Sequence, residues 1–270
     1  MKKHGLRIAL ALAFGLMTRP AHAFFDLESH PTDFTAYTLR RMEVRLGLFE
    51  WDFGLFRPLT LGTDTAPWAA GIIFRSVAAN VHAKVMFVHS RPLTVALAGA
   101  VYHATANVTD DGRGSVFILP VSVFVSSDLT RRVSLHFEAT YAHVALDGNA
   151  NLSHVAASGA AVTRTLQFGL MQEIRLSRVF AFQLRGRLQP SIAPAILHSD
   201  VATAPGTSVS IDASIYDHTV RYAFVGGIAI SGKNFDLNLG GGYGSYFIPS
   251  IGIALPGRSI IPDGSIDVRF

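Results

Sequence analysis

The stretch RVSLHFEATYAHVAL, residues 132–146, alternates apolar and polar side chains with a period of two residues. Val133, Phe137 and Tyr141 share one parity, while His136 and Glu138 share the other. A period of two places alternate side chains on opposite faces of a β-strand. The stretch therefore predicts a strand with one apolar face and one polar face that carries charge.

The same alternation recurs along the chain. It is clear at 81–87, 166–175, 180–189 and 234–247. Several of these runs are longer than the roughly five or six residues usual in soluble strands. They match the roughly 9–11 residues that a tilted transmembrane strand needs. We therefore expect strands with one face toward lipid and one toward an enclosed polar lumen.

Composition supports this interpretation. Apolar residues make up 49% of the chain and there is no cysteine, so no disulfide can stabilise it. No segment beyond the N-terminus reaches the roughly 18 uninterrupted apolar residues of a transmembrane helix. High apolar content without a long apolar run is typical of alternating membrane strands.

The N-terminus reads as a signal peptide over residues 1–23. A basic start is followed by an apolar stretch, residues 8–17, and by the A-x-A site at 21–23. We expect cleavage there, leaving one domain over residues 24–270. Four of the 23 cations lie in 1–23, which holds no acid, so residues 24–270 carry 19 charges of each sign. This balance gives no indication of a nucleic-acid partner.

The connections between the predicted strands alternate between short polar turns and longer segments. The longer ones lie near 66–78, 108–114, 147–161, 195–218 and 249–262. Outer-membrane barrels have short periplasmic turns and long extracellular loops, which gives this rhythm. Within 66–78 the alternation stops, and Pro67 in the first turn predicts a short helix, either at the outer rim or as a plug.

The last five residues give an independent indication. Ile266, Val268 and Phe270 alternate with Asp267 and Arg269. This pattern resembles the terminal strand of Gram-negative outer-membrane β-barrel proteins, whose final aromatic residue is recognised by the barrel-assembly machinery. The resemblance implies an outer-membrane location and an assembly signal made of Ile266, Val268 and Phe270. It identifies no subfamily.

Placing Phe270 at the periplasmic end gives eleven strands, and an even count requires a twelfth, which we place at 33–41. The predicted fold is thus an all-β, transmembrane, antiparallel up-and-down β-barrel of 12 strands. Ten strands is the rival if the first hairpin is not in the wall. Within 42–55 the apolar parity slips, which predicts a β-bulge near Phe49 and Glu50.

Charged residues of both signs fall on the inward parity. The pore-lining candidates are Lys84, His136, Glu138, Glu173, Arg175, Arg185, Arg187, Arg221 and Asp236, and Glu43, Arg45, His82, Asp267 and Arg269 share their face. Such groups either pair across a narrow lumen or flank a water-filled passage. Arg175, Arg185 and Arg187 would favour anions in a passage, whereas the adjacent Glu173 favours pairing.

The indications of an enzyme or a metal site are weak. His103 and His143 fall near the outer ends of strands, where a membrane lipid hydrolase would need its base, but no serine is evident at a comparable position, and Ser115 and Ser245 are the nearest. His198-Ser199-Asp200 lies in a predicted loop. Asp110-Asp111-Gly112 and Asp147-Gly148-Asn149 complete no calcium pattern. Gly240 to Gly244 lie within a strand, where glycines let neighbouring groups approach.

We therefore expect a monomeric barrel that is not an enzyme and has no metal and no cofactor. Its function is either a narrow passive channel or a structural barrel. Its expected partners are outer-membrane lipids and the barrel-assembly machinery. The alternatives are a membrane-embedded lipid hydrolase and a surface-binding barrel that holds a partner with loops 147–161 and 195–218.

Overall fold

The computed structural model describes most of the chain beyond residue 33. The described ranges are 34–73, 76–90, 92–109, 112–152, 155–177, 179–190, 192–203, 207–217, 219–232, 234–248, 253–254 and 257–270. The predicted signal peptide, residues 1–23, lies outside them. No helix in these ranges is both long enough and apolar enough to cross a membrane.

Strands dominate the structure. In chain order the elements are β1 (Val44–Gly47), β2 (Glu50–Phe56), β3 (Leu59–Asp64), α2 (Thr65–Ile73), β4 (Val77–His89), β5 (Leu93–Thr109), β6 (Gly112–Asp128), β7 (Val133–Leu152), β8 (Val155–Arg175), β9 (Phe180–Gln189), β10 (Ile192–Thr203), β11 (Thr207–Asp217), β12 (Arg221–Ser231), β13 (Phe235–Gly244), β14 (Phe247–Ile248), β15 (Ile253–Ala254) and β16 (Ser259–Arg269).

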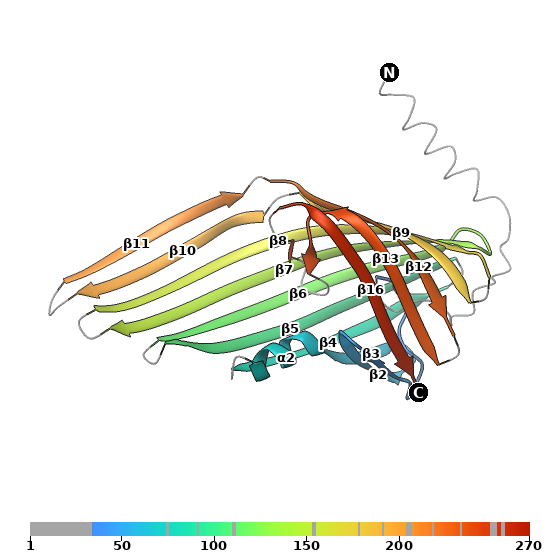
Figure 1. Ribbon diagram of the computed structural model, residues 1–270, viewed down its shortest axis with the longest axis horizontal. Helices are drawn as coiled ribbons and strands as arrows, with labels where there is room; N and C mark the ends of the chain where they lie inside the picture. Colours follow the sequence, from blue (N-terminus) through green and yellow to red (C-terminus); the bar gives the residue numbers. More distant parts are fainter. Residues whose placement is uncertain are drawn as a thin grey trace, which may run out of the picture.

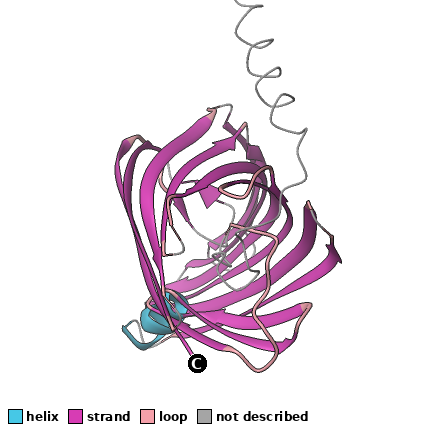
Figure 2. Cartoon of the chain, turned by 90° about the vertical axis from the view of Figure 1, so that its right-hand side faces the viewer, coloured by secondary structure: helices cyan, strands magenta, loops and turns pink. Residues whose placement is uncertain are grey.

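Twelve strands form a closed antiparallel ring. The ring runs from β1 to β9 and then through β12, β13 and β16, and β16 pairs back onto β1. Figure 1 shows the long strands side by side, and Figure 2 shows the ring from one end. The predicted 12-stranded up-and-down barrel is therefore confirmed. We call the end with the short connections, where β16 finishes, the turn end, and the opposite end the hairpin end.

The twelfth strand is not where the sequence placed it. Residues 33–41 contribute no strand to the wall over their described part, 34–41. Instead, the predicted strand 42–55 is two strands, β1 and β2, which pair with Leu46 opposite Trp51. The parity slip at Phe49 and Glu50 marks the turn of a tight hairpin, so the prediction of a bulge there was wrong. A turn and a bulge produce the same slip in an alternating pattern.

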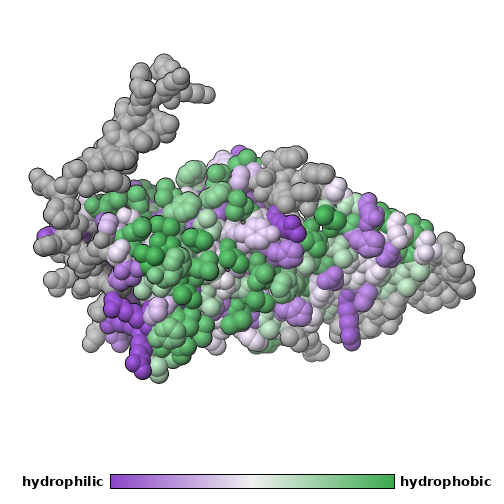
Figure 3. Space-filling view, turned by 180° about the vertical axis from the view of Figure 1, so that it is seen from behind, coloured by the Kyte–Doolittle hydropathy of each residue, from purple (hydrophilic) through white to green (hydrophobic). Residues whose placement is uncertain are grey.

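The two faces of the wall separate as predicted. On β7, Ser134 and His136 are fully buried, while Phe137 is 40% exposed and Tyr141 44% exposed. On β9, Phe180, Phe182 and Leu184 are exposed, while Gln183 is buried. Figure 3 shows apolar side chains gathered over the half of the outer surface nearer the turn end, with hydrophilic ones at the turn-end edge and again toward the hairpin end. An apolar outer band around a closed barrel is the surface that lipid covers in a transmembrane barrel.

The predicted long loops at 147–161 and 195–218 are largely strands. β7 and β8 pair from Leu152 opposite Val155 down to Val133 opposite Ile174. β10 and β11 form a further hairpin. β10 pairs with residues 155–165 of β8, toward the hairpin end, while β9 pairs with residues 168–175 of β8, toward the turn end. We call the parts of β5 to β8 that lie nearest the hairpin end, together with β10 and β11, the hairpin extension. The loop prediction was wrong because the outward apolar pattern ends there although the strands continue.

The wall is low on the opposite side. β1, β2 and β3 have only four, seven and six residues. The predicted short helix, α2, follows β3 and packs on β4. The side chain of Asn80 on β4 holds the end of β3, because its Oδ1 accepts from the Asp64 backbone N–H and its Nδ2 donates to the Asp64 carbonyl. Trp68 and Ile72 of α2 remain exposed. The helix thus lies at the rim of the low wall (Figure 1).

A charge on the outward face should destabilise the barrel in lipid. Leu184→Arg places a cation among outward apolar side chains, and the cost in a bilayer is about 2–4 kcal/mol at the midplane. Leu184→Met is the matched control. Equilibrium unfolding of both variants, refolded into phospholipid vesicles, measures the difference. Equal stability of the two variants would show that this face does not contact lipid.

Candidate functional site

The inward face of the barrel carries the candidate residues together. His136 and Glu173 are fully buried, and Glu138, Arg175, Arg221 and Asp236 are 5–8% exposed. Lys84 is half-buried, and the side chains of Arg185 and Arg187 are each 23% exposed. All nine predicted pore-lining residues thus lie on the inward parity. Whether they line an open passage depends on their partners.

Carboxylates accompany the three arginines that would have favoured anions. Arg175 Nε lies 3.0 Å from Glu173 Oε1, Arg185 Nη1 lies 3.1 Å from Asp263 Oδ2, and Arg187 Nη2 lies 3.7 Å from Glu138 Oε2. Arg185 and Asp263 are on β9 and β16, which are separated in the ring by the two strands β12 and β13. Both signs in contact favour the paired interpretation of the lumen over a cationic passage.

Two further inward cations also have partners that compensate their charge. Arg269 pairs with Asp236 and approaches Glu43 to 3.9 Å. The ammonium of Lys84 lies over the ring of Phe124, 4.7 Å from its centroid. Such a cation–π contact partly replaces the water that a buried ammonium loses. The lumen near the turn end is therefore electrostatically compensated.

Asp52 organises a second group of charges near the low wall. Arg45 Nε donates to Asp52 Oδ2 at 3.0 Å, and His82 Nε2 lies 2.6 Å from Asp52 Oδ1. Glu50, Asp52 and His82 bring possible metal-ligand atoms within 4.8 Å of one another. Arg45 also contacts Glu50, so its guanidinium already bonds both carboxylates of this group. The Arg45 guanidinium therefore already neutralises the negative charge of Glu50 and Asp52 that a metal ion would otherwise neutralise.

The N-terminal segment 34–40 occupies the lumen at the turn end, and we call it the N-terminal plug. Thr35 and Ala36 are fully buried and Leu39 is 2% exposed. The Ala36 N–H donates to Ser126 Oγ at 2.8 Å, and the Leu39 N–H donates to Thr60 Oγ1 at 2.9 Å. These bonds join plug backbone to wall side chains. The plug is therefore held inside the barrel without belonging to its ladder.

Aromatic groups anchor the plug deeper in the lumen. The Tyr37 ring packs edge-on against His136 with centroids 6.2 Å apart, and the Arg187 guanidinium lies 5.0 Å from the Phe34 ring centroid. Burial raises the pKa of the Tyr37 phenol, so this group stays neutral in the plugged state.

Two glycines of the wall make room for the plug. A Cβ at Gly169 would lie 2.4 Å from Phe34 Cζ, and one at Gly54 would lie 1.9 Å from the Arg40 carbonyl oxygen. Sequence reasoning missed the plug because residues 34–40 do not differ in composition from a short strand. Glycine at Gly54 and Gly169 on the inward parity was the available indication of close approach.

A connection folds inward from the other end. Between β13 and β16, Phe247 and Ala254 are buried with Ala223 and Ile261 in one apolar cluster. Arg221 donates to the Ala254 carbonyl, and the Ala254 N–H donates to Gln189 Oε1 at 3.0 Å. Arg221, predicted to line a pore, therefore holds this connection in place. Together with the N-terminal plug, it fills the lumen from both sides.

The glycines of β13 serve close packing of backbones. A Cβ at Gly242 would lie 2.0 Å from the Phe224 carbonyl oxygen, and one at Gly240 would lie 2.7 Å from that of Gly226. This confirms the interpretation that these glycines let neighbouring backbone approach.

The histidines considered for lipid hydrolysis do not face serines across the ladder. His103 lies opposite Phe117 and Ala79, and His143 lies opposite Leu119 and Arg164. His198 instead lies between two carboxylates, with Nδ1 2.6 Å from Asp212 Oδ1 and Nε2 3.1 Å from Asp200 Oδ2. Both of its ring nitrogens are engaged, so it is not placed to activate a nucleophile. Of Asp110-Asp111-Gly112, only Gly112 is among the described residues.

No protein-family model and no curated protein sequence matches the chain. Similar solved structures include the translocator domain of the autotransporter NalP from Neisseria meningitidis, at 11% identity over 84% of this chain and 83% of that one, with a TM-score of 0.44. The outer membrane protease OmpT from Escherichia coli shares 8% identity over 84% and 92% of the two chains, with a TM-score of 0.41. The Pseudomonas putida toluene transporter TodX shares 10% over 94% and 70%, with a TM-score of 0.41. At these values the comparisons transfer no activity or ligand to this chain.

Removing one partner of the buried ion pair between Arg175 and Glu173 should lower the free energy of unfolding more than removing both. Arg175→Met leaves the fully buried Glu173 carboxylate without its cation, and such a loss costs about 3–5 kcal/mol. The double variant Arg175→Met with Glu173→Gln should recover most of that stability, because it removes the uncompensated charge. Unfolding in lipid vesicles compares the three proteins. Equal losses in the single and double variants would show that the pair is not electrostatically coupled.

Proposed function

We propose that this protein is a narrow outer-membrane channel that its own N-terminal plug holds closed. The observation that carries the proposal is the position of the N-terminal plug, in which residues 34–37 and Leu39 lie buried inside a complete ring of strands. A ring of 12 strands is wider than the roughly eight whose side chains alone fill the interior, so removal of this segment would leave space inside the wall. The proposal assigns no catalytic step to the protein.

The way the plug is held supports its release. The backbone N–H groups of Ala36 and Leu39 donate to the hydroxyls of Ser126 and Thr60, so breaking these bonds leaves the wall's ladder intact. A net hydrogen bond contributes only about 0.5–1.5 kcal/mol. Such bonds are weak enough to exchange with water.

The backbone at the two ends of the plug favours the same step. Phe34 and Met42 adopt positive φ angles of 62° and 61°. Bulky residues in this region store about 1–3 kcal/mol of strain each. Release of the plug would relieve that strain and would expose the charged inward face to water.

Membrane location rests on the chemistry of the wall. The outer face of the closed ring carries exposed apolar side chains, which only lipid covers without cost. Ile266, Val268 and Phe270 face outward with exposures of 52%, 39% and 72%, so an assembly partner could reach them. We propose on this basis that the chain inserts as a monomer among outer-membrane lipids with the help of the barrel-assembly machinery. The turn end would then be periplasmic.

Removing the plug should open the channel. We expect the protein lacking residues 24–40 to conduct ions steadily in planar lipid bilayers, because the ring closes without the plug. The chain from residue 24 onward should be silent or open only briefly. Circular dichroism before and after heating checks that both are folded barrels. A folded deletion variant that does not conduct would identify a sealed structural barrel instead.

Locking the plug provides the opposite test. Since the chain has no cysteine of its own, Ala36→Cys with Ser126→Cys creates a single possible disulfide at an existing contact. Oxidised protein should lose even brief openings, and a reductant should restore them. Either cysteine alone serves as the control. Openings that persist in the oxidised protein would show that the plug is not the gate.

A further inference from the structure

The hairpin extension reverses the polarity of the wall. Toward the turn end, the outward side chains are apolar, as at Phe137 and Leu170. Polar groups begin on the same outward parity at His143 and Arg164, and they predominate beyond the register row that joins His103, Phe117, Ala145, Val162 and Ile196. Because the ladder is continuous through this row, the reversal comes from residue type and not from a change of register. It marks where the outer surface ceases to suit lipid tails.

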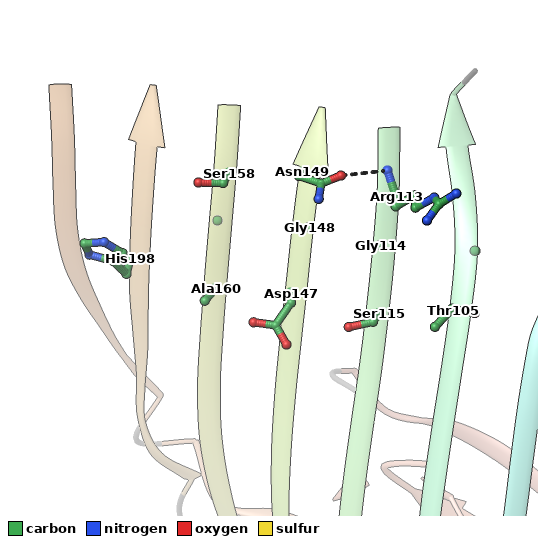
Figure 4. A pocket seen from close by; sticks show the side chains of 12 residues that line it. Thr105, Arg113, Gly114, Ser115, Asp147, Gly148, Asn149, Ser158, Ala160 and His198 are labelled. Carbon is green, nitrogen blue, oxygen red and sulfur yellow. Dashed lines mark hydrogen bonds between the residues drawn. The ribbon is translucent and has the colours of Figure 1, made fainter. Parts of the chain in front are cut away.

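Directly beyond that row lies an outward line of polar and small residues. Thr105 pairs with Ser115, Ser115 with Asp147, Asp147 with Ala160, and Ala160 with His198. Residues in register share a face of the sheet, so these five side chains lie side by side across five strands. Figure 4 shows them along the strands, with Arg113, Asn149 and Ser158 one step further toward the hairpin end.

These residues line a cavity of about 540 Å³. Its floor is formed where Gly114, Gly148 and Gly159 lie in one register row across three neighbouring strands. By parity these glycines belong to the inner face, so they add only backbone to the floor, and the space outside comes from short outward side chains such as those of Ser115 and Ala160. A volume of this size is within the roughly 300–1,000 Å³ range of small-molecule sites.

The lining is rich in hydrogen-bonding groups and nearly balanced in charge. Thr105, Ser115 and Ser158 offer hydroxyls that both donate and accept, while the amide of Asn149 accepts from the Arg113 N–H at 3.3 Å. Arg113 and Asp147 contribute one charge of each sign.

His198 does not add a free cation to this lining. The hydrogen bond that His198 Nδ1 donates to the Asp212 carboxylate raises the pKa of His198, and Asp200 lies on its other side, so a charge on the imidazole is compensated by two carboxylates. A site with donors and acceptors but little net charge suits a ligand of many hydroxyls better than one of several phosphates.

We propose that this outward cavity binds the sugar headgroup of a glycolipid from the surrounding membrane leaflet. The inference rests on the membrane location proposed above and is independent of the plug. Its position carries the choice of ligand, since a headgroup in the cavity leaves the acyl chains on the adjoining apolar residues Phe117, Val162 and Ile196. Ile196 is 61% exposed, immediately beside His198 in the outward pattern of β10.

The adjacent residues Ala160 and Ala161 give a matched pair for the test. Both are half-buried, but Ala160 faces the cavity while Ala161 pairs with Leu197 and Leu146 on the inner face. Ala160→Phe fills the cavity and Ala161→Phe does not. Ser115→Ala with Asp147→Ala removes hydrogen-bonding groups without adding bulk.

Native mass spectrometry of the full chain in detergent, titrated with dephosphorylated lipid A or with phosphatidylglycerol, reads out the binding. We expect unsubstituted protein to retain the glycolipid at least tenfold more tightly than phosphatidylglycerol. Ala160→Phe and the double alanine variant should lose this preference, and Ala161→Phe should keep it. Flotation of every variant with phospholipid vesicles verifies membrane insertion separately.

Two results would overturn the proposal. Equal retention of the two lipids by the unsubstituted protein would show that only unspecific lipid surrounds the barrel. Retention of the preference in Ala160→Phe would place the glycolipid elsewhere. Neither result bears on the channel, because plug deletion and conductance do not involve this cavity, and a failed flotation would instead contradict the membrane location itself.

Discussion

Every feature of this structure depends on the closure of one hydrogen-bonded ladder. Within lipid there is no water to satisfy backbone N–H and C=O groups, so a sheet that spans a membrane must have no open edge. The seam between β16 and β1 achieves this closure, with the Phe270 N–H donating to the Val44 carbonyl at 3.0 Å and the Val44 N–H to the Phe270 carbonyl at 3.2 Å. The first and last strands of the chain thus complete each other.

Closure determines what the inward face must be. Once the ring is complete, one parity of every strand is enclosed, and its polar groups must find partners among themselves. Ion pairs such as Arg175 with Glu173 neutralise inward charges. The plug occupies part of the lumen, and its backbone donates to inward hydroxyls such as that of Ser126. A ring of 12 strands is wider than the roughly eight whose interior side chains alone can fill it. The plug and the inward connection at Ala254 therefore occupy space that the wall leaves.

The sequence predicted most of the wall because lipid imposes a period of two on it. Stretches such as 133–141 and 180–188 required only the alternation of residue type to be assigned to strands and faces. The pattern failed where the surroundings change. At Phe49 and Glu50 a hairpin turn produces the same slip as a bulge, and the plug, most of which is enclosed in the lumen, has no lipid-facing side that would impose alternation on it. The pairing of Arg185 with Asp263 could not be predicted either, because β12 and β13 separate their strands and only the closed ring brings the two side chains together.

The error at 147–161 carries physical information of its own. The strands β7 and β8 continue through this range, yet the outward residues change from Tyr141 and Leu166 to Asp147 and Ser158. Since backbone pairing is unchanged across the boundary, the change lies in residue type alone, as a change of medium outside the wall would require. In the membrane orientation proposed above, the point at which a loop was predicted is where the outer surface passes from lipid tails to headgroups. A wall that stays ordered through that boundary presents rigid polar surface to the headgroup layer, which flexible loops would not do.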